Sequence, residues 1–215
     1  MHTPPIFRSL LLFASATAFA SATLDTAPLE SWIRHQSGIR TLQADFTQER
    51  KLASLKQPVT AKGHLAFARP SKMRWELGEP AQTVAISNGE TLTLMNTGEK
   101  TAMKIPADHP QARQFTILAG DAFRDLAAFQ QRFELVESRV TNGIYQLTVR
   151  PKEQGLRNNV PWMFLDIDPA NHELRALELE LKDKSRVRTI FTHTTLNPTL
   201  PASLFQADLT GYRMR

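Results

Sequence analysis

One stretch of the sequence predicts the fold: Gly63-His64-Leu65-Ala66-Phe67-Ala68-Arg69-Pro70-Ser71-Lys72-Met73-Arg74-Trp75-Glu76-Leu77. Large apolar residues occupy every second position on both sides of Pro70. This period of two predicts two β-strands, each with one apolar and one polar face. Pro70 cannot donate a ladder hydrogen bond, so strand pairing should end there. Arg69 should therefore lie at the rim of an apolar sheet face.

The same alternation recurs along most of the chain. Asn88-Gly89 and Asn142-Gly143 are strong signals for tight hairpin turns between strands. The pattern predicts about ten or eleven antiparallel strands in one domain. Beyond the two strands above, the candidate segments for these strands lie near residues 41–52, 84–86, 92–94, 100–105, 133–140, 145–149, 162–167, 174–181, 187–195 and 204–209.

Three helices are expected in addition to the strands. Thr26 begins the first helix, which carries Leu29, Trp32 and Ile33 on one face and ends at Gly38.

Residues 110–131 lack alternation and predict a pair of helices. The first carries Phe115, Leu118 and Ala119 and ends at Gly120, and Asp121 caps a second that carries Phe123. Such a pair needs an apolar partner, and the concave side of the sheet offers one.

The start of the chain predicts export. Residues 1–22 combine a basic residue, Arg8, with an apolar run from Leu10 to Ala20 that is too short to span a bilayer. A cleavage site after Ala22 leaves a single domain over residues 23–215, which we expect in the periplasm. A buried N-terminal helix is the alternative interpretation of this segment.

Composition excludes several classes of protein. The net charge is +5, spread along the chain without a basic block, so we expect no nucleic-acid partner. The sequence contains no cysteine, which excludes disulfides, thiol chemistry and lipid attachment to an N-terminal cysteine.

No catalytic or metal-binding motif is present. The sequence lacks Gly-x-Ser-x-Gly, a phosphate-binding loop, Gly-x-Gly-x-x-Gly and His-Glu-x-x-His. His64 and His193 are expected on outward strand faces, and Asp45 and Glu49 share a polar face. We therefore expect no enzyme activity, no catalytic residues, no metal and no cofactor.

What remains is apolar volume between the sheet and the helical pair. It is either a filled core or a cavity for acyl chains, and the pattern alone fits both. The residues expected to line it are Phe46, Leu65, Phe67, Met73, Trp75, Val84, Ile86, Leu92, Leu94, Phe115 and Phe123.

These motifs also resemble a known family. Phe46-Thr47-Gln48, Arg69-Pro70, Met73-Arg74-Trp75 and Ile86-Ser87-Asn88-Gly89 are similar to segments of the LolA family of periplasmic carriers for outer-membrane lipoproteins. The resemblance implies an unclosed antiparallel β half-barrel with a helical lid over a hydrophobic cavity. The fold class would be mainly β, or α+β.

The resemblance also implies partners and a clamp. The cargo would be an acylated lipoprotein or a lipid, received from an inner-membrane ABC-type exporter and passed to an outer-membrane acceptor by a carrier that we expect to be a monomer. In that family the arginine matching Arg69 binds carbonyls of the lid, which here would be those of Leu118, Ala119 and Gly120. Without the resemblance, Arg69 is an ordinary turn residue.

One departure from the family leaves an alternative open. Many members carry an aromatic-rich strand where this chain has Thr91-Leu92-Thr93-Leu94-Met95. A LolA-like paralogue that carries or senses another lipid, such as a glycolipid or a polyene, is therefore the second hypothesis.

Overall fold

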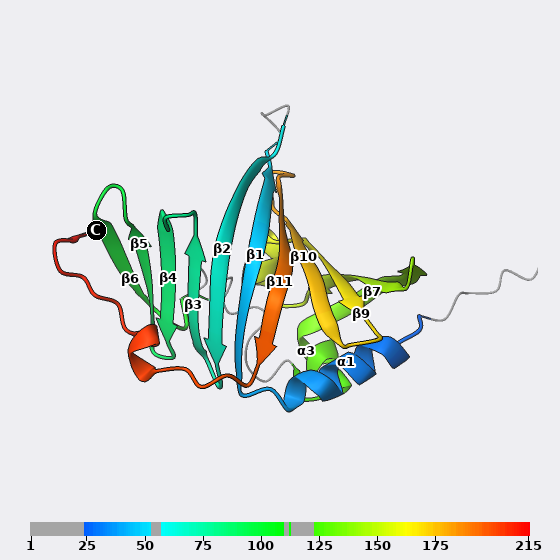
Figure 1. Cartoon of the computed structure of the whole chain (residues 1–215). Helices are drawn as coiled ribbons and strands as arrows, with labels where there is room; N and C mark the ends of the chain where they lie inside the picture. Colours follow the sequence, from blue (N-terminus) through cyan, green and yellow to red (C-terminus); the bar gives the residue numbers. More distant parts are fainter. Residues whose placement is uncertain (1–23, 53–56, 110–111, 113–122) are drawn as a thin grey trace, which may run out of the picture.

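The computed structural model describes residues 24–52, 57–109, 112 and 123–215 (Figure 1). Twelve strands form one sheet in the order β12-β6-β5-β4-β3-β2-β1-β11-β10-β9-β8-β7. Neighbouring strands are antiparallel except β12 and β6, which are parallel. The end strands β12 and β7 do not pair with each other, so the sheet is unclosed. The expected mainly β, open-sheet fold is confirmed.

The elements have the following bounds. The strands are β1 (Thr41–Lys51), β2 (Val59–Ala68), β3 (Lys72–Leu77), β4 (Thr83–Asn88), β5 (Thr91–Asn96), β6 (Thr101–Pro106), β7 (Phe133–Thr141), β8 (Ile144–Pro151), β9 (Trp162–Asp168), β10 (Glu173–Glu180), β11 (Arg186–Leu196) and β12 (Arg213–Met214). The helices are α1 (Ala27–Ser37), α3 (Leu126–Arg132), α4 (Gln154–Asn159) and the 3-10 helix η2 (Ala202–Phe205). None of the helices in these described residues is long and apolar enough to cross a membrane.

Two local predictions were wrong. The expected strand over residues 204–209 is instead the end of η2 followed by an irregular segment, whose Ala207 and Leu209 pack on the sheet rather than pairing within it. Helix α3 begins after Asp125, whose carboxylate accepts a hydrogen bond of 2.7 Å from the backbone N–H of Ala128. Asp121, the predicted cap, lies outside the described residues.

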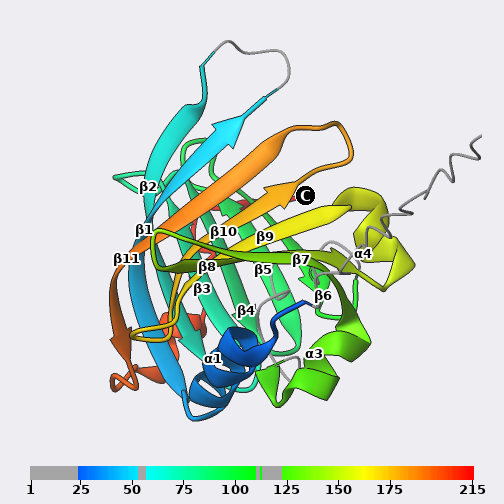
Figure 2. The same ribbon diagram turned by 90° about the vertical axis from the view of Figure 1, so that its right-hand side faces the viewer.

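The sheet has an inner face, on which α1 and α3 pack, and an outer face. Phe46 on β1 and Phe191 on β11 are paired on the inner face, between strands β2 to β6 on one side and strands β8 to β10 on the other. Figure 2 shows α1 and α3 together at one end of the curved sheet. Their side chains form the main core with β8, β9 and β10. Its fully shielded members include Leu29, Ile33, Val149, Met163, Leu165 and Ile167.

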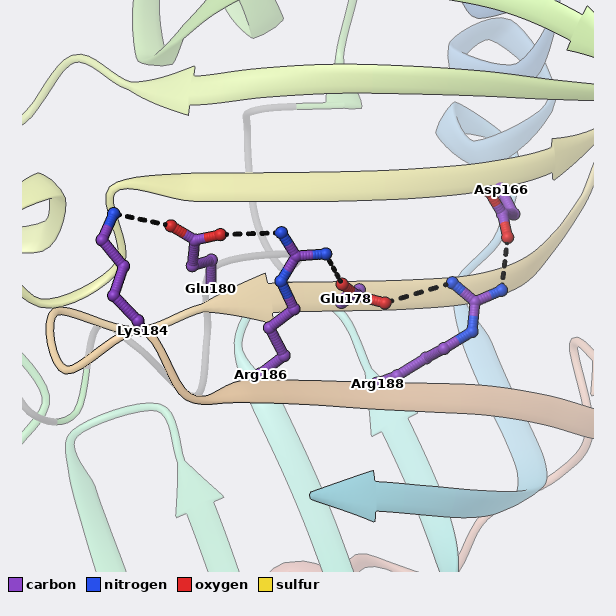
Figure 3. Close-up of polar contacts among 6 residues, drawn as sticks. All are labelled: Asp166, Glu178, Glu180, Lys184, Arg186 and Arg188. Atoms are coloured by element: carbon purple, nitrogen blue, oxygen red, sulfur yellow. Dashed lines mark hydrogen bonds and ion pairs between the residues drawn. The ribbon is translucent and has the colours of Figure 1, made fainter. Parts of the chain in front are cut away.

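Charged side chains tie β9, β10 and β11 together on the outer face (Figure 3). The chain of ion pairs runs through Lys184, Glu180, Arg186, Glu178, Arg188 and Asp166. Each carboxylate in this chain meets at least one cation across or beside its strand. The alternation of sign favours the observed register of these strands.

The ring of Phe46 occupies the space above Gly63 on the inner face. The two residues are directly paired, and a Cβ on Gly63 would overlap both the Phe46 ring and the Glu76 carbonyl oxygen. The Phe46 ring then stacks on Trp75, with centroids 4.1 Å apart, and meets Phe191 at 6.4 Å. A glycine at position 63 therefore lets one aromatic ring bridge the two halves of the inner face.

This contact predicts that Gly63→Ala destabilises the protein. The added methyl group overlaps backbone as well as a side chain, so relief requires the strands to shift. We expect a loss of about 1–3 kcal/mol in the free energy of unfolding, measured by urea denaturation. Gly155→Ala on α4 is the matched control for glycine removal, because its φ is not positive and the atom nearest to a Cβ there is Glu153 Oε1, at an ordinary contact distance of 3.9 Å. Full stability of Gly63→Ala would contradict the close packing of Phe46.

The outer ladder predicts a pH dependence. The hydrogen bond from Lys184, assisted by that from Arg186 and opposed by burial, lowers the pKa of Glu180 below its ordinary value of 4.5. A carboxyl whose pKa is lowered by folding adds stability above its unfolded pKa and loses it as the pH falls through its folded pKa. Glu180→Gln should therefore lower the free energy of unfolding by at most about 1 kcal/mol at neutral pH. The effect is small because Lys184 is largely exposed, and solvent screens its ion pair with Glu180.

The cost of Glu180→Gln should shrink toward zero as the pH falls from 7 to about 3, measured by urea unfolding at each pH. Glu137→Gln is the control, because Glu137 is exposed and has no ion pair with a described residue. A cost for Glu180→Gln that stays constant over this range would contradict the role of the ladder.

Candidate functional site

Strand pairing gathers the predicted apolar residues into two rows on the inner face. One row crosses β2 to β6 in register through Leu65, Trp75, Ala85, Leu94 and Met103. The neighbouring row runs through Phe67, Met73, Ser87, Leu92 and Ile105. The rows form a continuous apolar surface of five strands, interrupted by one small hydroxyl.

Burial differs sharply between the two halves of the inner face. On β8 and β9 the inward side chains are fully shielded, as for Leu147 and Leu165. On β2 to β6, in contrast, several large apolar side chains of the two rows stay partly exposed: Leu65, Phe67, Trp75, Leu94 and Met103. The half formed by β2 to β6 therefore presents apolar surface that the protein itself does not fully cover.

Two predicted lining residues lie on the opposite face. Val84 pairs with Met95, and Ile86 lies between Arg74 and Thr93 in the register, so both side chains point outward. They pack under the C-terminal segment, against Ala207, Leu209 and Tyr212. The structure thus separates Val84 and Ile86 from Leu92 and Leu94, and they are part of a second, outer core. A pocket of about 160 Å³ beside Ile86 and Phe205 also lies on this outer side.

Phe123 lies at the helical end of the inner face. It is 5% exposed and meets Trp32 of α1 edge to face, with ring centroids 5.2 Å apart. The predicted lid residues Phe115, Leu118, Ala119 and Gly120 lie outside the described residues. Ala112, which is described, is buried against Ala85, Leu92 and Ile105. Ala112 itself therefore lies on the inner face.

Arg69 binds the end of helix α1. Its Nε donates to the carbonyl oxygen of Ile39 at 2.7 Å, and its Nη2 donates to that of Gln36 at 3.0 Å. The backbone N–H of Arg69 also donates to the carbonyl oxygen of Arg40 at 2.8 Å. Carbonyls at a helix C-terminus lack intrahelical partners and favour a cation. Arg69 therefore fastens α1 and the loop after it to the corner between β2 and β3.

Titratable side chains gather outside the apolar surface. On the outer face, one carboxylate oxygen of Asp45 lies 2.7 Å from Nδ1 of His64, and the other lies 3.3 Å from Nδ1 of His193. At the α1 end, His172 contacts Ser31 Oγ at 2.8 Å and stacks on His35 with centroids 5.1 Å apart. No group of three or more metal-ligating side chains occurs among the residues that the structure describes. The outward placement of His64 and His193 agrees with the sequence pattern.

The predicted lining lacked several inner-face residues, among them Ala85, Met103, Ile105 and Phe191. A strand over residues 100–105 was predicted, and its alternation would have identified Met103 and Ile105 as apolar neighbours. Phe191 is joined to the site by its pairing with Phe46, which requires the long-range register of β1 and β11.

Comparison with known proteins agrees with this fold. A relative from Dechloromonas aromatica (strain RCB), named outer-membrane lipoprotein carrier protein, is 25% identical over 189 residues, covering 80% of this chain and 82% of its own. One of the same name from Cupriavidus pinatubonensis (strain JMP 134 / LMG 1197) is 27% identical over 210 residues, covering 92% and 89%. An uncharacterised conserved protein from Thermus thermophilus shares the fold, with a TM-score of 0.51 at 9% identity over 87% of this chain and 97% of its own.

The family match extends over most of the sequence. The model of the outer membrane lipoprotein carrier protein LolA matches residues 37–208, from the end of α1 to the C-terminal segment on the outer face. This chain belongs to the LolA family of outer membrane lipoprotein carrier proteins.

Proposed function

We propose that this protein is a periplasmic carrier that binds the acyl chains of lipoproteins on its apolar inner face. It receives them from an inner-membrane ABC-type exporter and delivers them to an outer-membrane acceptor, acting as a monomer without bond chemistry. The observation that carries the proposal is the partly exposed apolar surface of β2 to β6, formed by Leu65, Phe67, Trp75, Leu94 and Met103. An acyl chain laid on this surface would cover apolar area that the protein leaves open.

The energetics of such cargo require a cover that opposes binding. Burying an acyl chain of about sixteen carbons contributes roughly 12 kcal/mol before any cost, at about 0.8 kcal/mol per CH₂. A carrier holding cargo at that strength would release it too slowly. Displacing protein groups that cover the inner face offsets part of this free energy. Among the described residues, Ala112 on the inner face and the end of α1 bound by Arg69 support the proposal of such a cover.

The main test is the identity of the cargo and its dependence on the inner face. Native mass spectrometry of protein purified from the periplasm should find a lipoprotein bound to the wild type. Leu92→Glu puts a charge in the centre of the inner surface, where Leu92 is 1% exposed, and should abolish both the cargo and the binding of a fluorescent fatty acid.

Thr91→Glu is the matched control, since it adds the same charge on the same strand but on the other face. Leu94→Glu repeats the test at a partly exposed position, where folding is easier to retain, and circular dichroism reports the fold of each variant. A free glycolipid or polyene in the wild-type spectrum would favour the alternative LolA-like paralogue. Fatty-acid binding that survives in folded Leu92→Glu and Leu94→Glu would contradict binding at the inner face.

The second test concerns Arg69 as a clamp on the cover. Arg69→Leu removes the two side-chain hydrogen bonds to Gln36 and Ile39, and any to the proposed acceptors at Leu118 to Gly120. Each charge-assisted bond contributes about 1.5–3 kcal/mol. The cover should then open more easily, so cargo should bind more tightly and leave more slowly. Arg69→Lys should restore only part of the release rate, because an ammonium lacks the planar fork of a guanidinium.

The measurement is cargo release to an acceptor or to liposomes, with thermal stability measured alongside. Arg157→Leu on α4 is a control for the loss of an arginine away from the inner surface. Equal release from the wild type, Arg69→Leu and Arg69→Lys would leave Arg69 as a turn residue without a role in release.

A further inference from the structure

Trp32 is buried at the centre of the apolar face of α1. It is 3% exposed and lies between Leu29 and Ile33, which are 0% and 1% exposed. Its ring packs edge to face on Phe123. Rotating α1 to bring the indole into solvent would also expose Leu29 and Ile33. The burial of these two residues therefore keeps Trp32 inside.

The indole N–H of Trp32 has no hydrogen-bond acceptor. Its Nε1 is shielded from solvent and is the one buried side-chain nitrogen or oxygen without a partner in the part of the chain that the structure describes. Buried tryptophans usually find an acceptor for this donor, because leaving it unpaired lowers the stability of the fold. An aromatic edge contact such as that with Phe123 compensates a donor only weakly. A phenylalanine would remove the unpaired donor but would leave the volume of the second indole ring unfilled.

A ligand can supply the acceptor only if it carries one into the apolar interior. A hydrocarbon chain has none, whereas the carbonyl oxygen of an ester or amide at the head of an acyl chain accepts a hydrogen bond well. We propose that Trp32 is the polar anchor of the cargo site, donating its indole N–H to the carbonyl of an ester- or amide-linked acyl chain. This inference rests on the proposed carrier function and names the chemical feature of the cargo that the site selects.

The aromatic contacts indicate the direction of the bound chain. Phe191 packs against the core cluster that contains Trp32, and its ring lies 6.4 Å from that of Phe46. Phe46 in turn stacks on Trp75, in the centre of the exposed apolar rows. With its carbonyl at Trp32, the chain would pass Phe191 and Phe46 and extend over Trp75.

The experiment compares two lipids that differ by one carbonyl group: 1-monopalmitoylglycerol, an ester, and its hexadecyl ether. Each displaces a fluorescent fatty acid from the purified full-length protein. The wild type should bind the ester about tenfold more tightly, equivalent to about 1.4 kcal/mol. Trp32→Phe should bind both lipids with similar affinity, and circular dichroism without lipid reports whether the variant keeps its fold. Trp162→Phe, on the outer face beside Arg150, should keep the wild-type preference.

A direct measurement on the unmodified protein accompanies the variants. In a spectrum of protein with ¹⁵N-labelled tryptophan, the indole N–H signal of Trp32 should move downfield with the ester and much less with the ether. Equal affinity of the wild type for the two lipids, or a preference that persists in Trp32→Phe, would overturn the anchor while leaving the carrier function intact. Failure of both lipids to bind the wild type would overturn both the anchor and the carrier function.

Discussion

The fold depends on one close contact, the ring of Phe46 lying over Gly63. That ring is at once in register with Phe191 on β11 and stacked on Trp75 of β3. It therefore joins the core on the β8-to-β10 half with the apolar rows on the β2-to-β6 half. Any side chain at position 63 would lift the ring off the sheet and separate the two. The aromatic contact between the two halves thus depends on the absence of a side chain at one position.

The two halves of the inner face have different physical roles. On the β8-to-β10 half, α1 and α3 shield the apolar side chains almost completely, and an alternating ladder of charges fixes the strands on the outer face. On the β2-to-β6 half, the outer face is covered by the C-terminal segment, while the inner rows remain partly exposed. Stability is concentrated where the core is closed, which lets the other half present apolar surface without unfolding the domain.

The sequence predicted the open β fold and most of the inner surface because alternation is unambiguous in β2 and β3. It failed in β4, where Val84, Ala85, Ile86 and Ser87 are all buried. A strand shielded on both faces carries no alternation to show which side chains point inward. Only its register with β3 and β5 decides, and that register places Ala85 inside and Val84 outside. The observed acceptors of Arg69, the carbonyl oxygens of Gln36 and Ile39, could not be predicted from the sequence either, because they depend on how α1 packs against the sheet.

Helix α1 carries two polar features: carbonyl oxygens near its C-terminal end that are bound by Arg69, and the unpaired indole N–H of Trp32. The free energy of each sets the role that it could have in a carrier. The two hydrogen bonds from Arg69 fasten its C-terminal end and together contribute about 3–6 kcal/mol. That is well below the roughly 12 kcal/mol gained by burying one acyl chain, so Arg69 alone cannot determine whether cargo stays bound. In the proposed carrier, the rest of the free energy that opposes cargo binding would have to come from apolar contacts that the cargo displaces. In the proposed carrier, a clamp of this strength would adjust the release rate, and the unpaired donor of Trp32 would set the preference for one acyl head group over another.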